Sequence, residues 1–145
     1  MTADDPADVV LDTHTVASLL KLYLRELPEP LVPYDMYESV MTIITREVPI
    51  VGERRAAAKL GDLLAARLSP ANYNTLQCVC QFLADVASCS DDNKMNVTNL
   101  ATVFALCFLR PDAGDDPGLM LATQANRSTA AQVCCVLSLT SFFYL

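Results

Sequence analysis

Apolar residues recur every three or four positions along most of this chain, in windows separated by proline, glycine or polar stops. This spacing places them on one face of an α-helix, which turns once every ~3.6 residues. Helices are therefore expected at 13–27, 34–48, 53–68, 70–87 and 97–109, with a last one after 118. Because the connections between them are short, the pattern predicts an all-α bundle.

The composition supports one folded domain that does not bind nucleic acid. The chain has 145 residues, of which 52% are hydrophobic and 19% are charged, so it carries enough apolar surface to offset chain entropy. The excess acid behind the net charge of −7 lies in the N-terminal segment 1–12 and in 112–117. The rest of the chain is balanced, whereas a nucleic-acid-binding domain is typically basic.

Cysteine and histidine usage predicts neither a metal site nor a cofactor. Most of the six cysteines lie in apolar helical patterns without a Cys-x-x-Cys pair, which indicates free, buried thiols. The lone histidine, His14, is expected to be a first-turn helix residue with a local hydrogen bond, because no nucleophile partner is evident. With no signal peptide, we expect a cytoplasmic protein.

The apolar stretch Ala130–Leu145 could be a last core helix or a membrane tail anchor. It is shorter than the ~20 residues that span a bilayer, and polar residues interrupt it. No Lys or Arg follows it, as would be usual beside an anchor. A core helix is therefore favoured, and membrane contact is not indicated.

The first expected helix, 13–27, carries two bases on one side. Its apolar residues form a stripe that is expected to face the core: Val16, Leu19, Leu20, Tyr23, Leu24 and Leu27. Lys21 and Arg25 project away from this stripe. Bases near a helix C-terminus are favoured by the helix dipole, and they are also suited to an acidic or phosphate-rich partner. The residues alone leave both explanations open.

A proline-rich connector, Leu27–Pro33, follows this helix. Its three prolines stop the helix and predict a stiff, extended segment. The sequence Pro30-Leu31-Val32-Pro33 also fits the PxxP pattern that SH3 domains bind. The connector is therefore either structural or a ligand for an SH3 groove.

Three segments together resemble the RhoGAP family, the GTPase-activating domains for Rho-type small G proteins. They are His14–Pro33 (HTVASLLKLYLRELPEPLVP), Asn72–Leu83 (NYNTLQCVCQFL) and Asn93–Pro111 (NKMNVTNLATVFALCFLRP). The sequence of these segments is most similar to the subgroup that includes the filamin-associated RhoGAP. The resemblance covers about residues 8–111 and is weak over 112–145, so 13–145 is interpreted as a partial RhoGAP domain.

The resemblance implies an all-α RhoGAP-like bundle that is truncated at its N-terminus. It implies a regulator in signal transduction that binds a GTP-loaded Rho-, Rac- or Cdc42-type G protein, without an active site of its own. Matching the family's motifs residue by residue, the G-protein-binding residues would be Lys21, Arg25, Lys94 and Asn99. No metal, cofactor or nucleic acid is implied.

Two departures from the family pattern lower the expected activity. The family's arginine finger lies in a loop upstream of the His14 motif, but no arginine precedes His14 here, so no catalytic residue is assigned. Such an arginine is worth about 10³–10⁵ in rate. At the family's Asn position stands Cys107, which lacks the amide group. We therefore expect little activation, or a catalytically dead interaction module, and uncovered apolar surface where N-terminal helices would lie.

Overall fold

The computed structural model describes residues 12–112, and in this range the chain forms helices and turns. The 3₁₀ turn η1 begins the second helical stretch, and η2 is a π-helical segment within it. In chain order the elements are α1 (Thr13–Arg25), η1 (Tyr34–Met36), α2 (Tyr37–Thr42), η2 (Ile43–Glu47), α3 (Val48–Val51), α4 (Glu53–Arg67), α5 (Pro70–Ser88), α6 (Ser90–Asn93) and α7 (Val97–Phe108). The predicted all-α class is confirmed.

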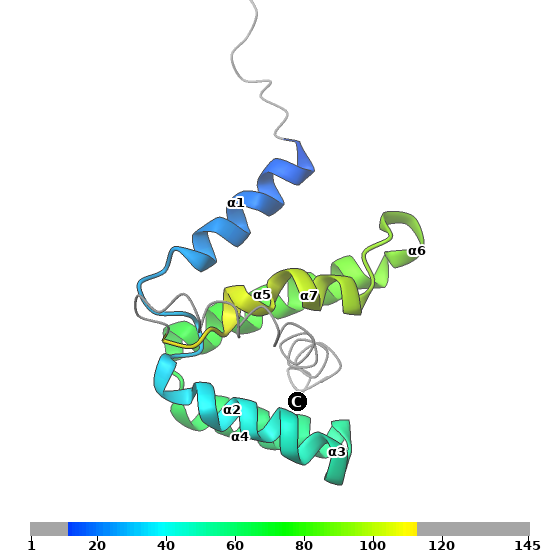
Figure 1. Ribbon diagram of the computed structural model, residues 1–145. Coiled ribbons are helices and arrows are strands. Elements are labelled where there is room, and N and C mark those ends of the chain that lie inside the picture. The colour runs from blue at the N-terminus through cyan, green and yellow to red at the C-terminus, as the bar shows by residue number, and fades with distance from the viewer. Residues whose placement is uncertain (1–11, 113–145) are drawn as a thin grey trace, which may run out of the picture.

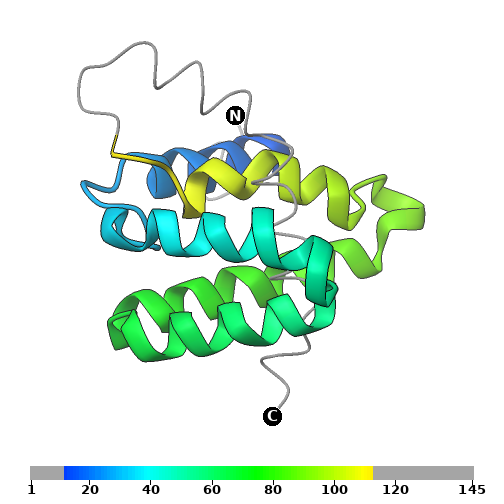
Figure 2. The same ribbon diagram turned by 60° about the horizontal axis from the view of Figure 1, so that its bottom comes forward.

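The helices pack in a bundle with α7 at a junction between α1 and α5 (Figure 1). Figure 2 shows α1 and α7 on one side, α4 and α5 on the other, and the stretch from α2 to α3 between them. The chain therefore places its first described helix against its last one.

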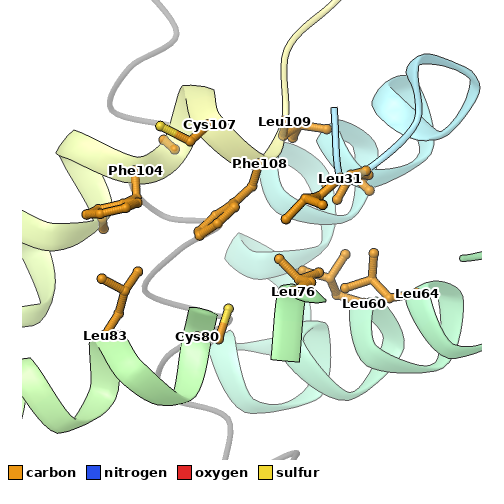
Figure 3. Packing of buried hydrophobic residues seen from close by; sticks show 14 of the residues in the cluster. Leu31, Leu60, Leu64, Leu76, Cys80, Leu83, Phe104, Cys107, Phe108 and Leu109 are labelled. Carbon is orange, nitrogen blue, oxygen red and sulfur yellow. The ribbon is translucent and has the colours of Figure 1, made fainter. Parts of the chain in front are cut away.

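A single hydrophobic cluster joins these elements (Figure 3). The rings of Phe104 and Phe108 lie 6.1 Å apart on the inner side of α7. They point toward Leu83 and Cys80 of α5, with Leu76 and the α4 leucines beyond. Phe108 is among the largest fully buried side chains, so α7 is the central helix that its apolar sequence predicted.

Side-chain caps mark the starts of α5 and α7. Ser69 Oγ accepts a hydrogen bond from the Asn72 N–H at 3.1 Å, and Pro70 occupies the first turn of α5. Asn96 Oδ1 accepts from the Asn99 N–H at 2.9 Å and begins α7. Both caps satisfy an N–H that the helix itself leaves free.

The second helical stretch differs from the prediction, which ended it at Val48 because Pro49 follows. The helix instead continues to Val51 through the π-helical segment Ile43–Glu47. Pro49 is tolerated because it stands in the first turn of α3, where its missing N–H costs little. Gly52, at φ 82°, then ends the stretch as expected.

A short helix occupies part of the predicted polar loop 88–93. α6 spans Ser90–Asn93, with Asp91 and Asp92 in its first turn, where the helix dipole favours acids. The predicted final helix, the stretch Ala130–Leu145, nearly all of the acidic segments and the last two cysteines lie outside the described residues. None of the described helices is long and apolar enough to cross a membrane.

The expected inward stripe of α1 is correct for three of its six residues and wrong for the other three. Leu24 is buried, whereas Leu19 is 52% exposed and Tyr23 is 64% exposed. Among described residues, α7 covers one side of α1, so Leu20, Leu24 and Leu27 face the bundle. Val16, Leu19, Leu22 and Tyr23 form an exposed apolar face on the remaining side of α1.

Shortening the side chains of Leu19 and Leu24 in α1 to alanine should therefore change the free energy of unfolding by different amounts. Leu24→Ala is expected to lower the free energy of unfolding by about 2–5 kcal/mol, because it leaves a cavity against α7. Leu19→Ala should cost less than about 0.5 kcal/mol, since this side chain is half exposed. Urea denaturation of both variants measures the contrast. Equal losses would contradict the observed orientation of α1.

Cys80 should make stability fall at alkaline pH. Burial raises the pKa of its thiol to about 12, while an unfolded thiol titrates near pH 9.0. Between these values the unfolded chain loses a proton that the folded chain retains, so rising pH favours unfolding. Each pH unit within this window costs up to about 1.4 kcal/mol.

Denaturation at about pH 8 and about pH 10.5 tests this expectation. Cys80→Ala serves as the comparison, because it shares every other alkaline group with the wild type. Its stability should fall less steeply between the two pH values. Identical falls would show that the Cys80 thiol does not contribute.

Candidate functional site

Two basic side chains stand near the C-terminal end of α1, where the helix approaches α7. Arg25 is exposed and is the last residue of the helix, while Lys21 is half-buried one turn earlier. Figure 1 shows α1 and α7 converging toward their C-terminal ends. The negative end of the α1 dipole favours both charges there.

Arg110, just beyond α7, brings a third cation to the same place. Its Nη2 donates a hydrogen bond to the carbonyl O of Leu27, and its guanidinium carbon lies 6.0 Å from the centroid of the Tyr34 ring. Arg110 lies in the third segment that resembles the family, but no binding role was predicted for it. The sequence feature that could have indicated its role is its position between a buried helix and Pro111.

Cys107 lies beneath these cations and is buried. Its Sγ is 3.8 Å from the carbonyl O of Lys21 and 3.9 Å from that of Val103, so the side chain faces the α1 backbone. Burial raises the pKa of the Cys107 thiol, and the positive charges of Arg25, Lys21 and Arg110 oppose that rise. The Cys107 contact with the Lys21 carbonyl and the Arg110 bond to the Leu27 carbonyl place these basic residues, with Arg25 between Lys21 and Leu27 in the chain, at the end where α1 meets α7.

Lys94 and Asn99 lie at the other end of α7. Lys94 has a positive φ of 59°, and its Nζ donates to the carbonyl O of Asp91. Asn99 Nδ2 donates to the carbonyl O of Lys94 at 3.1 Å. Because each residue adds about 1.5 Å to a helix, Asn99 lies roughly 12 Å along α7 from Cys107. The structure therefore separates this pair from Lys21 and Arg25.

The connector after α1 is held inside the bundle. Pro30, Leu31 and Val32 are buried, and the Val32 N–H donates to the carbonyl O of Phe108 at 3.0 Å. An SH3 groove needs PxxP side chains that are accessible. The suggested SH3-binding function of Pro30–Pro33 is therefore contradicted in this fold, and the segment is structural.

The other side chains considered from the sequence were His14 and possible metal ligands. His14 is exposed on the first turn of α1. Across 12–112, no three histidine, cysteine or acidic side chains gather in a way that could hold a metal ion. What does gather is positive charge, on a surface bordered by the exposed apolar face of α1.

Comparison with known proteins decides the family. The RhoGAP domain model matches residues 3–113, which is most of the chain. The chain belongs to the RhoGAP family. The predicted membership is thus confirmed, over nearly the same residues that carried the resemblance.

Relatives of this RhoGAP chain carry names that agree with the assignment. Mouse Rho GTPase-activating protein 22 is 44% identical over 119 residues, covering 80% of this chain and 16% of that protein. Rat Rho GTPase-activating protein 24 is 47% identical over 112 residues, covering 77% of this chain and 15% of that protein. The chain thus spans about a sixth of the length of these relatives.

Solved structures support the same fold. The crystal structure of human Rho GTPase activating protein 15 matches with a TM-score of 0.71 at 24% identity, covering 95% of this chain and 60% of that one. The BH domain from GRAF, a GTPase regulator associated with focal adhesion kinase, matches with a TM-score of 0.66 at 25% identity, covering 95% of this chain and 69% of that one.

Proposed function

We propose that this RhoGAP chain regulates a Rho-, Rac- or Cdc42-type G protein by docking on its GTP-bound form. The observation that carries the proposal is the position of Lys21, Arg25 and Arg110 where α1 and α7 meet: the Lys21 carbonyl contacts Cys107 of α7, Arg25 ends α1, and Arg110 bonds to the Leu27 carbonyl just beyond it. Family membership gives this basic surface a partner class, because the relatives are Rho GTPase-activating proteins.

The docking chemistry follows from the exposure of these charges. Arg25 is exposed and Lys21 is half-buried, so a partner can reach both without unfolding the chain. A GTP-bound G protein presents phosphate charge beside loops that the nucleotide orders. Guanidinium and ammonium groups at a partly desolvated interface form charge-assisted hydrogen bonds to such acceptors. Lys94 and Asn99 support the second end of α7 through their local hydrogen bonds.

We further propose that docking brings little acceleration of GTP hydrolysis. The first arginine in the chain is Arg25, and it belongs to a helix packed on α7 rather than to a loop upstream of His14. An arginine finger must reach the transferred phosphoryl group to stabilise its charge. The chain would then act as a docking module, which affects the G protein by occupying its binding surface rather than by accelerating hydrolysis.

A binding titration tests the proposed function. Rho, Rac and Cdc42, each loaded with a GTP analogue that is not hydrolysed or with GDP, are titrated with the chain. At least one should bind, with the GTP-analogue form favoured by about tenfold or more, or ~1.4 kcal/mol. No binding by any of them, or equal affinity for both nucleotide forms, would overturn the proposal.

A further inference from the structure

The connector between α1 and η1 is tied to three other parts of the fold. The Asn72 side chain of α5 donates to the carbonyl O of Leu31 at 3.0 Å. The Val32 N–H donates to the Phe108 carbonyl O at the end of α7. Arg110 donates to the Leu27 carbonyl O. The first two contacts hold the buried part of the connector, whereas the third holds its junction with α1.

Arg110 is the charged contact at this junction. Its side chain lies between the Leu27 carbonyl and the Tyr34 ring, while Tyr34 Oη donates in turn to the Pro28 carbonyl O at 3.4 Å. The buried Nη1 has no hydrogen-bond partner among the described residues. A buried donor without an acceptor lowers stability, so this arginine is poorly explained as a stabilising residue alone.

The placement of its charge suggests another role. The Leu27 carbonyl lies directly beyond α1, at the negative end of the helix dipole. A cation at that end satisfies acceptors that the helix leaves free. Arg110 supplies this cation from just beyond α7, while the Arg25 side chain remains exposed.

We propose that Arg110 is a positioning residue, which joins the end of α1 to α7 and thereby sets where Lys21 and Arg25 stand for G-protein docking. The inference rests on the proposed function, and it adds a residue that does not itself touch the partner. Without the bond to Leu27, α1 would be held near its end by Leu24 and the Cys107 contact. Its two cations would then sample more than one direction.

A double-mutant cycle tests the proposal in the full chain. Arg110→Met should weaken binding of the favoured GTP-analogue-loaded G protein about tenfold, which is the scale of one charge-assisted hydrogen bond. In a Lys21→Ala/Arg25→Ala background the same change should cost less than about twofold, because the groups that Arg110 positions are gone. Equal losses in both backgrounds would overturn the proposal, since they indicate direct contact or general destabilisation.

Two further variants separate positioning from folding. Arg110→Lys retains the charge without the planar fork, so it should recover part of the lost affinity. Arg67→Met serves as the matched control, since Arg67 forms an exposed ion pair with Asp35 at 2.7 Å and lies outside the basic surface. Its affinity should stay within about twofold of the wild type. A loss for Arg67→Met as large as that for Arg110→Met would overturn the proposal.

Amide hydrogen exchange provides a readout that needs no partner. In Arg110→Met, exchange should quicken about tenfold at the Glu26 N–H, which donates to the Leu22 carbonyl O at 2.9 Å. Amides of α5 should keep their protection. Unchanged exchange at Glu26 would overturn the inference even if no G protein binds. Faster exchange there without any binding would overturn the proposed function and leave the link between α1 and α7 intact.

Discussion

Single-turnover GTP hydrolysis by Rac, Cdc42 or Rho is expected to accelerate less than about tenfold when this chain is added at saturation, against about 10³–10⁵-fold for an activator that supplies an arginine. The reason is positional. Arg25 ends a helix that packs on α7, and Arg110 is engaged with the Leu27 carbonyl. Neither is therefore expected to reach the nucleotide of a bound G protein.

The matching domain of mouse Rho GTPase-activating protein 22, which is 44% identical over 119 residues, serves as the comparison in this assay. Both proteins are added to the same loaded G protein in excess. Acceleration of about a hundredfold or more by this chain would refute the expectation. Arg25→Ala and Arg110→Ala would then show which arginine substitutes for the finger, because only the responsible variant loses the acceleration.

Reversing the charges on α1 should abolish docking. Lys21→Glu/Arg25→Glu is expected to weaken binding of the GTP-analogue-loaded G protein by at least about a hundredfold, because two attractive contacts become repulsive ones. Wild-type affinity should also fall as salt concentration rises, since partly exposed charges are screened. Equilibrium titration at two salt concentrations measures both effects.

The start of α4 offers a matched control for this reversal. Arg54 and Arg55 are exposed there, and Arg54→Glu/Arg55→Glu changes the net charge by the same amount. Its affinity should fall by less than about threefold, because only long-range attraction is altered. Equal losses in the two double variants would mean that net charge, rather than the α1 surface, governs binding.

The sequence predicted the fold best where a helix has both a clear start and apolar residues along its whole length. α5 and α7 begin at Pro70 and Val97, where the predicted windows 70–87 and 97–109 begin. The capping side chains of Ser69 and Asn96 each bond within three residues of themselves. The burial of α7 was likewise predictable, since nearly every side of it is apolar. Because neighbouring residues determine such features, they can be predicted from a single sequence.

Features that depend on distant neighbours were not predictable in the same way. The stripe on α1 was correct as a pattern, yet Leu19 and Tyr23 are exposed because α7 covers a different side. The π-helical segment 43–47 shifted the end of its helix past Pro49. The role of Arg110 depends on Leu27, which lies far from it along the chain. The sequence identifies Lys21 and Arg25 as candidate binding residues, but only the folded structure shows which residues surround them.

The pairing of α1 with α7 also imposes a delay during synthesis. α1 is complete at Arg25, whereas its partner is complete only at Phe108. At ~5–20 residues per second, ribosomes need about 4–17 s to make the intervening chain. During that time α7 is not yet available to cover Leu24. The apolar side of α1 is therefore exposed on the nascent chain, where chaperones or other apolar surfaces can bind it. The helix that carries the basic residues is therefore synthesised well before the helix that it packs against.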